Sequence, residues 1–130
     1  ELVKKTAKNI SEESDIEISE THHNLKRDIP SGTALILADS INEGAKVRKK
    51  HSYRLQSANL VRKKNEIGFS SIRGGDVVGE HSVYFFLDGE RIELTHRALD
   101  RKIFSNGALR AAVWIFKKKP GMYSLIDVLG

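Results

Sequence analysis

The chain has 130 residues, 39% of them hydrophobic and 30% charged, with a formal net charge of +5 and no cysteine. This length allows one domain with a hydrophobic core, and the lack of cysteine excludes a disulfide scaffold and cysteine-based metal sites. No apolar run is long enough to span a bilayer and no signal-peptide pattern is present at the N-terminus, so we expect a cytoplasmic protein without a membrane partner.

The first part of the chain predicts a helix, a strand and a second helix. Leu2–Ile10 reads as the end of a helix with a basic polar face, and the alternation in Asp15–Glu20 is typical of a short half-buried strand. The second helix is expected to begin at Pro30-Ser31-Gly32-Thr33 and to end at Gly44, because glycine commonly stops a helix.

A charged and poorly periodic excursion, Lys46–Lys64, separates this helix from the remaining strands. Bulky residues occupy both sides of the strand that contains Tyr84 and Phe85, so we expect it to be covered on both faces, by helices of the chain or by another subunit. Asp88-Gly89 is typical of a two-residue hairpin turn after this strand. We expect a strand near Tyr53–Leu55, renewed structure over Glu66–Arg73, and strands over Val77–Leu87 and Arg91–Arg97.

The last helix is expected to start near Asp100, which can cap it, and to bury a stripe formed by Phe104, Ala108, Ala111 and Ile115. Because strands and helices are segregated along the chain, the fold class is α+β: a mixed open β-sheet with helices packed on one face. The other face is expected to be apolar and to be used for oligomerisation.

The start of the second helix is a candidate anion site. The first amides of a helix have no acceptor within the helix and the helix dipole is positive there, so a carboxylate or a phosphate can bind to them. Gly32 allows close approach to the backbone, and the hydroxyl of Thr33 adds a donor. The alternative is an ordinary helix cap formed by Ser31 behind a helix-starting proline.

Two adjacent imidazoles and a lysine precede this helix start and favour an active site. His22 and His23 are expected to point in different directions, and an imidazole can give or take a proton near neutral pH. Lys26 can neutralise carboxylates and share the proton donation, and Asp28 is expected to pair with it or to cap the turn. A surface loop and a metal half-site are the alternatives, but we expect no metal, because no nearby Cys, Asp or Glu completes a tetrahedral set.

The other histidines carry less information. His51 is expected to face solvent, whereas His81 and His96 lie on expected strands and are more typical of core or interface histidines. Gly74-Gly75 reads as a bend, because a dinucleotide site needs a longer glycine fingerprint after a strand.

Several blocks of the sequence resemble the dihydrodipicolinate reductase family of lysine and diaminopimelate biosynthesis. Glu20–Ala34 is similar at every fixed position to that family's signature, E-x-H-H-x-x-K-x-D-x-P-S-G-T-A. The resemblance covers nearly the whole chain. The other similar blocks are Arg73–His81, Arg101–Ala112, Pro120–Tyr123 and Asp127–Leu129.

The resemblance implies an oxidoreductase with two domains, in which residues 1–130 would be the single substrate-binding and oligomerisation domain. A Rossmann domain, absent from this chain, would bind NADH or NADPH, and the enzyme would be a homotetramer. It would transfer a hydride to a small cyclic dicarboxylate and then a proton to the neighbouring carbon. The isolated chain would be inactive, because nothing in it positions a hydride donor.

The resemblance also implies roles for individual residues. The general acid would be His22, assisted by Lys26. The substrate carboxylates would be bound by His23, Ser31, Gly32 and Thr33. Arg101 and Phe104 would face the nicotinamide end of the cofactor.

Two other functions remain open. A non-catalytic dicarboxylate-binding or assembly module would keep the same pocket. A nucleic-acid binder would use basic runs such as Arg62-Lys63-Lys64, but aromatic residues are not interleaved with these charges. We therefore expect solvated faces there and no nucleic-acid partner.

Overall fold

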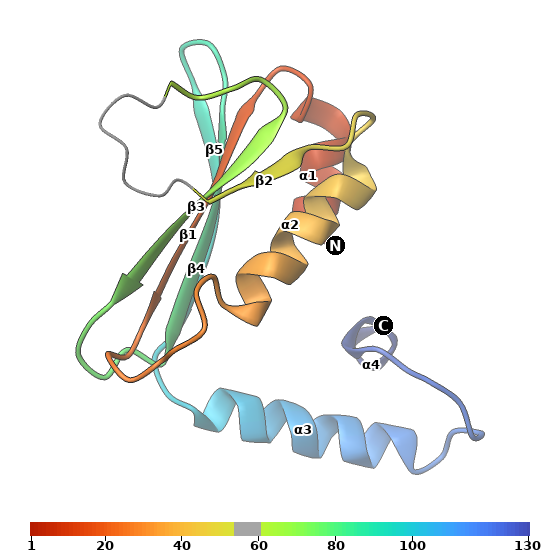
Figure 1. Cartoon of the computed structure of the whole chain (residues 1–130). Coiled ribbons are helices and arrows are strands. Elements are labelled where there is room, and N and C mark those ends of the chain that lie inside the picture. Colours follow the sequence, from red (N-terminus) through yellow and green to blue (C-terminus); the bar gives the residue numbers. More distant parts are fainter. Residues whose placement is uncertain (54–60) are drawn as a thin grey trace. The chain divides into compact units, whose positions relative to one another are not determined.

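Five strands form one mixed sheet in residues 1–97, the first of two units of the computed structural model (Figure 1). The second unit is residues 98–130, and the structure describes residues 1–53 and 61–130. Strand β3 is parallel to β1 and to β2, whereas β4 is antiparallel to β1, which confirms the predicted fold class. The strands are β1 (Asp15–His22), β2 (Lys50–Ser52), β3 (Glu66–Arg73), β4 (Gly79–Phe86) and β5 (Arg91–Ala98), in the spatial order β2-β3-β1-β4-β5.

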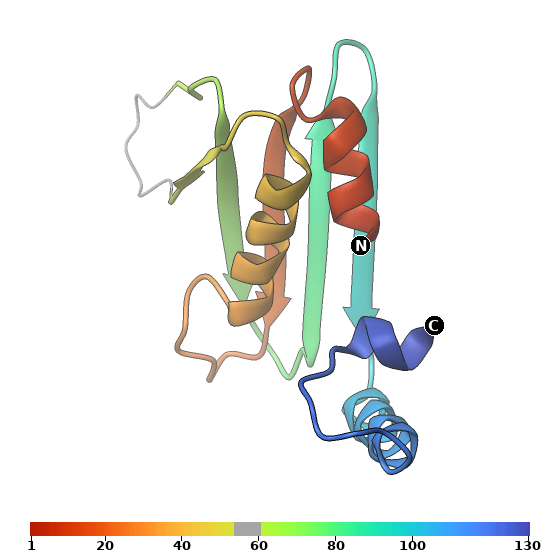
Figure 2. The ribbon, with the colours of Figure 1, turned by 90° about the vertical axis from the view of Figure 1, so that its right-hand side faces the viewer.

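Two helices, α1 (Leu2–Ile10) and α2 (Gly32–Gly44), cover one face of this sheet, as Figure 2 shows. Their apolar side chains pack against the alternate strand residues that point toward them. The helices bury Val3, Ala7, Ala34, Ala38 and Ile41. The strands contribute Ile16, Ile18, Ile67, Val83 and Phe85 to the same core.

Gly44 is the end of α2, as predicted, and the structure adds a further reason for a glycine at this position. It is the last helical residue, and the chain leaves the helix through an extended Ala45. A β-carbon placed on Gly44 would lie 2.2 Å from the carbonyl oxygen of Lys4. Glycine is therefore required where α1 and α2 touch, a contact between helices that the local pattern does not reveal.

The uncovered face of the sheet is more polar than predicted. Tyr84 on this face is half-buried, Phe86 is 36% exposed, and the hydroxyl of Ser19 donates a hydrogen bond of 3.3 Å to the Tyr84 hydroxyl. The prediction of an apolar face is wrong, because the alternation that points isoleucines at the helices points polar groups outward; its use for oligomerisation remains a prediction. Strand β1 places Asp15, Glu17, Ser19 and Thr21 on this face.

Most strand bounds differ from the predicted ones by one or two residues: β1 continues to His22 instead of Glu20, and β5 to Ala98 instead of Arg97. Strand β3 occupies Glu66–Arg73, where structure was expected to resume, but β2 lies before Tyr53–Leu55, of which residues 54 and 55 fall outside the described residues. Strand β4 begins at Gly79 instead of Val77, because the Gly74-Gly75 bend is longer than expected. The Asp88-Gly89 hairpin turn is present, with Gly89 at φ +76°.

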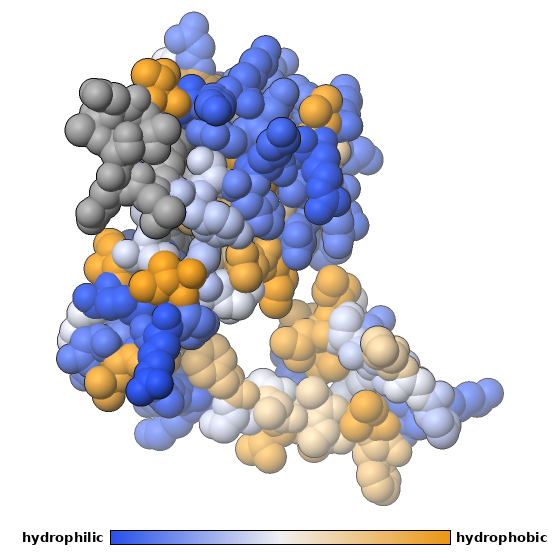
Figure 3. Space-filling model, in the orientation of Figure 1, coloured by the Kyte–Doolittle hydropathy of each residue, from blue (hydrophilic) through white to orange (hydrophobic). Residues whose placement is uncertain are grey.

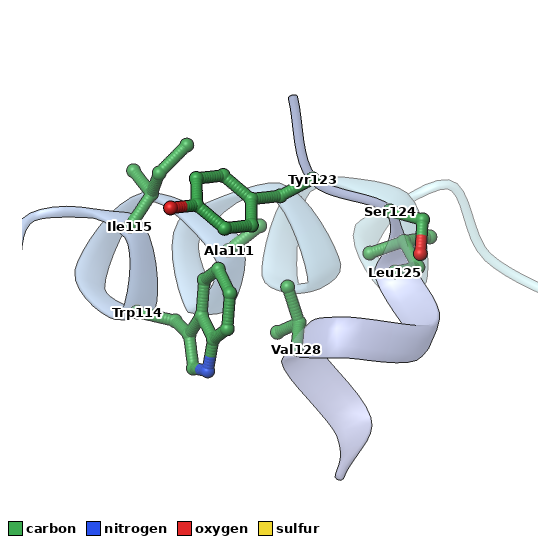
Figure 4. Close-up of a pocket in the computed structure, with 7 residues that line it drawn as sticks. All are labelled: Ala111, Trp114, Ile115, Tyr123, Ser124, Leu125 and Val128. Atoms are coloured by element: carbon green, nitrogen blue, oxygen red, sulfur yellow. The ribbon is translucent and has the colours of Figure 1, made fainter. Parts of the chain in front are cut away.

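The second unit holds α3 (Lys102–Ile115) and α4 (Leu125–Leu129). The N-cap of α3 is Arg101 and not the predicted Asp100, although Oδ1 of Asp100 accepts a hydrogen bond of 2.8 Å from the amide of Lys102. The predicted buried stripe is wrong, because α3 buries no residue and Phe104 and Ile115 are 57% and 48% exposed. A hollow of about 130 Å³ lies in this unit. Figure 4 shows the residues that line it: Ala111, Trp114, Ile115, Tyr123, Ser124, Leu125 and Val128.

Apolar side chains stay exposed over much of this unit, which Figure 3 shows as orange and tan surface. The short helix α4 covers only part of α3. The helical periodicity of the α3 sequence therefore identifies an apolar face of the helix but does not tell what packs against it. Among the described residues, no helix is long and apolar enough to cross a bilayer.

Candidate active site

The face of β1 that points at the helices changes from apolar to polar along the strand. After Ile16 and Ile18, the same alternation brings Glu20 and His22 to this face, where they are only 2% and 8% exposed. Glu20 lies opposite Ser71 of β3 and His81 of β4, and His22 lies opposite Arg73 of β3. The candidate site therefore begins where the hydrophobic core ends.

Glu20 is a buried carboxylate with donors on several elements. Its Oε1 accepts hydrogen bonds from the backbone amide of Ser31 at 3.1 Å and from Nη2 of Arg73 at 2.9 Å. Burial alone would raise the pKa of Glu20, but hydrogen bonds from Arg73, Ser71 and Ser31 outweigh it and hold that pKa at about 2. Glu20 is thus a fixed negative charge near neutral pH.

His22 turns one ring nitrogen toward this charge. Its Nδ1 lies 2.6 Å from Oε2 of Glu20, and neither atom has a hydrogen-bond partner elsewhere among the described residues. On the other side of the ring, a β-carbon on Gly79 would lie 3.2 Å from Nε2. Burial lowers the pKa of His22, the positive charges of Lys26 and Arg73 lower it further, and Glu20 opposes them.

Arg73 connects the sheet to the loop that follows β1. Besides binding Glu20, its guanidinium donates to the carbonyl oxygens of Lys26 at 3.3 Å and Asp28 at 2.7 Å. The amide of Gly74 donates to the carbonyl oxygen of His22 at 3.0 Å. The loop after β1 and the connection from β3 to β4 therefore lie together at one end of the sheet, as Figure 1 shows.

His81 joins the cluster from β4. Its Nε2 is 3.1 Å from Oγ of Ser31, and its ring meets the ring of His22 edge-on at a centroid distance of 4.9 Å. Burial lowers the pKa of His81, and the neighbouring His22 lowers it further. The sequence treated His81 as a structural histidine, whereas the structure places it against the candidate general acid.

Lys26 and His23 lie in the loop directly after β1. Nζ of Lys26 pairs with Oδ1 of Asp28 at 2.9 Å, as predicted, and this contact lowers the pKa of Asp28. The Lys26 charge also lowers the pKa of both His22 and His81. His23 is half-buried at the start of the same loop.

The start of α2 offers free space for an anion. Gly32 and Thr33 are exposed, and a β-carbon on Gly32 would meet no atom within 4 Å. The first helix amides have no acceptor inside the helix, so these residues can bind a carboxylate. Ser31 is occupied inside the protein instead: its Oγ accepts from the amide of Ala34 at 3.3 Å, and its amide donates to Glu20.

Three of these side chains could also be read as metal ligands. The ligand atoms of Glu20, His22 and His81 all lie within 4.8 Å of one another. The fold thus supplies the nearby carboxylate that the sequence analysis did not find. Arg73 and Ser31 already bind that carboxylate, and a guanidinium beside it repels a second cation, so the geometry favours holding a proton over holding a metal.

Arg101 and Phe104 belong to the second unit, where both are exposed near the start of α3. Their contact with a cofactor remains a prediction. Sequence reasoning also missed residues that the structure adds to the site. These are Glu20, Arg73, Gly79 and His81.

One signal could have identified Glu20. It shares the strand side of Ile16 and Ile18, so it had to be buried, and a buried carboxylate requires charged or hydrogen-bonding partners. Arg73 and His81 are the residues opposite this part of β1 in the neighbouring strands, but that pairing follows only from the sheet order β3-β1-β4.

Known proteins share the family and the fold of this chain. The family model described as "Dihydrodipicolinate reductase, C-terminus" matches residues 1–129, so the chain belongs to that family, as the resemblance predicted. The chain is similar to the 4-hydroxy-tetrahydrodipicolinate reductases of Wolbachia pipientis wMel, with 50% identity over 98% of this chain and 50% of the relative, and of Geobacter sulfurreducens, with 47% identity over 99% and 49%.

A solved structure shares the fold. The dipicolinate-bound dihydrodipicolinate reductase from Paenisporosarcina sp. TG-14 matches with a TM-score of 0.70 and 25% identity, over 97% of this chain and 49% of that chain. The chain therefore spans about half the length of the relatives that it matches.

Proposed function

We propose that these residues form the substrate-binding and assembly domain of a 4-hydroxy-tetrahydrodipicolinate reductase, which acts in lysine and diaminopimelate biosynthesis in the cytoplasm. The observation that carries the proposal is that one carboxylate, Glu20, contacts both the imidazole of His22 and the capped start of α2. An acid group and an anion site are thereby held beside each other. The relatives, of whose length this chain matches about half, are named for the same reaction, and these names support the proposal.

The substrate is a cyclic dicarboxylate. The exposed amides of Gly32 and Thr33 bind one carboxylate, the Thr33 hydroxyl adds a donor, and His23 contributes from the preceding loop. Ser31 shapes this site through its internal hydrogen bonds. The ammonium of Lys26 offsets the negative charge that two carboxylates bring into the site.

The reduction needs a hydride and a proton. NADH or NADPH supplies the hydride to one ring carbon when it is bound by a nucleotide-binding domain outside these residues. His22 then gives the proton on Nε2 to the neighbouring carbon, while the proton on Nδ1 stays beside Glu20. Lys26 assists this protonation from the loop after β1. The exposed guanidinium of Arg101 and ring of Phe104 are suited to contact the nicotinamide end.

Assembly uses the uncovered sheet face in a homotetramer. This face carries the half-buried Tyr84 and the partly exposed Phe86, with the Arg91 guanidinium 5.6 Å from the Phe86 ring centre. Aromatic and arginine side chains are enriched in protein interfaces. No nucleic-acid or membrane partner is part of the proposal.

Calorimetric titration of the complete enzyme with pyridine-2,6-dicarboxylate tests the substrate site. We expect saturable binding by the wild type and at least ~10-fold weaker binding by Thr33→Val, because a donor to the carboxylate is lost. Thr6→Val on α1, where the hydroxyl bonds only the Leu2 carbonyl in its own helix, is the control and should bind like the wild type. Absence of binding by the wild type, or equal binding by Thr33→Val, would contradict the proposed site.

A further inference from the structure

We propose that Glu20 and Arg73 are positioning residues for His22: Arg73 fixes the Glu20 carboxylate, and Glu20 fixes the His22 ring so that Nε2 faces the ligand. The inference deepens the proposed function and rests on it, since it takes His22 to be the general acid. It adds a second layer of residues that contact the acid and not the substrate.

The first step is the anchoring of Glu20. Its Oε1 is held from β3 by Arg73 and from the start of α2 by the Ser31 amide, so donors from two other elements fix one oxygen. The other oxygen, Oε2, then points at Nδ1 of His22. Rotation of the carboxylate would break its contacts with Arg73 and with His22, and Glu20 and His22 are almost closed to water.

The second step is the orientation of the imidazole. A half-turn of the ring would replace Nδ1 by a carbon and leave a buried carboxylate oxygen without its partner, which costs free energy. Gly79 leaves room at Nε2, and the edge-on ring of His81 closes a further side. Nδ1 is therefore the nitrogen that stays inward, and Nε2 is the nitrogen that can give a proton away.

The third step concerns the charge on the ring. The groups that face His22 are Glu20 on its own strand, Lys26 in the loop after β1, Arg73 on β3 and His81 on β4. Burial, Lys26 and Arg73 all disfavour the protonated ring, and Glu20 is the one that favours it. A general acid must carry its proton before it can react, so removing this charge should leave fewer molecules protonated at neutral pH.

The test measures kcat and KM against pH in the complete enzyme. Glu20→Gln removes the charge, and Glu20→Asp keeps a charge for Arg73 but withdraws it from Nδ1. We expect kcat to fall ~10–100-fold with a change in KM of less than ~3-fold, and the loss of kcat at high pH to begin at lower pH than in the wild type. The control is Glu43→Gln, whose carboxylate pairs with Lys4 on the surface and should leave both parameters unchanged.

Glu20→Asp keeps the test decisive if Glu20→Gln does not fold. A folded Glu20 variant with wild-type kcat and an unchanged pH profile of kcat would overturn the inference. A rise in KM that accompanies the fall in kcat, with an unchanged pH profile, would overturn it too. His22→Asn separates this inference from the proposed function. An inactive His22→Asn beside unaffected Glu20 variants defeats only the positioning role, whereas an active His22→Asn defeats the assignment of the acid and the inference with it.

Discussion

Gly79 lies so close to His22 that a β-carbon on the glycine would be 3.2 Å from Nε2 of the imidazole. This distance is shorter than ordinary van der Waals contact, so one of the two groups would have to move. The nitrogen affected is the one to which we assign proton donation.

We therefore expect Gly79→Ala to lower kcat ~10-fold or more while the protein stays folded, because a small displacement of a catalytic group is costly. The measurement is steady-state kinetics on the complete enzyme beside its thermal melting temperature. Gly107→Ala on α3, where an added β-carbon meets no atom within 4 Å, is the control and should keep wild-type turnover. Equal activity of the two variants would show that the position of Nε2 does not depend on the space that Gly79 leaves.

Acid should destabilise the protein through Glu20. Its pKa falls from an ordinary 4.5 to about 2 on folding, so the stabilisation is complete above pH 4.5 and is lost as the pH falls toward about 2. At 1.36 kcal/mol per pH unit of pKa difference, the loss amounts to roughly 3 kcal/mol at most. Urea unfolding of the wild type and of Glu20→Gln between about pH 2 and 6 measures this loss, because the free energy of unfolding should fall more steeply with decreasing pH in the wild type. An equal pH dependence of that free energy in the two proteins would refute the depressed pKa.

Arg73→Gln should be strongly destabilising. It leaves the buried carboxylate of Glu20 without its charged partner and frees the carbonyl oxygens of Lys26 and Asp28. Breaking one partner of a buried pair costs about 3–5 kcal/mol, which urea unfolding detects. Arg97→Gln provides the comparison, because the Arg97–Glu80 pair is exposed and should be worth less than about 1 kcal/mol. Faster amide exchange in residues 24–30 should accompany only the Arg73 change.

Gly44→Ala should also destabilise, by about 1–3 kcal/mol, because its β-carbon would overlap the carbonyl oxygen of Lys4 and push α1 away from α2. The effect is opposite to the small gain that alanine normally brings inside a helix. Thermal denaturation measures the change. A gain in melting temperature would mean that the two helices can separate without loss.

Local periodicity predicted most elements of the first unit, but it placed a strand near Tyr53–Leu55, whereas β2 lies at Lys50–Ser52. The helical segment Leu2–Ile10 agrees with the structure, and the segment Glu66–Arg73, where structure was expected to resume, is strand β3. The stripe through Phe104 and Ile115 was predicted to be buried and is not, because a periodic pattern reports an apolar face but not its cover. The end of α2 at Gly44 was predicted correctly, but its approach to Lys4 was not, since Lys4 lies in another helix.

The candidate site was predicted in part. His22, Lys26 and the start of α2 are marked by residue types in one short stretch, and the structure brings them together around Glu20. Arg73 is 53 residues from Glu20 in the sequence, and its role depends on which strands are neighbours. Contacts of that kind follow from sheet order, which no local pattern contains.

Strand β1 carries both the core and the chemistry on a single side. The alternation that sends Ile16 and Ile18 under the helices also delivers Glu20 and His22, so a slip of one residue against β3 and β4 would expel all four together. A chain with the wrong strand register would thus lose its stability and its activity together. Stabilising substitutions are therefore difficult to introduce in this strand, whereas the outer surfaces of α1 and α2 can be altered with far less effect on the reaction.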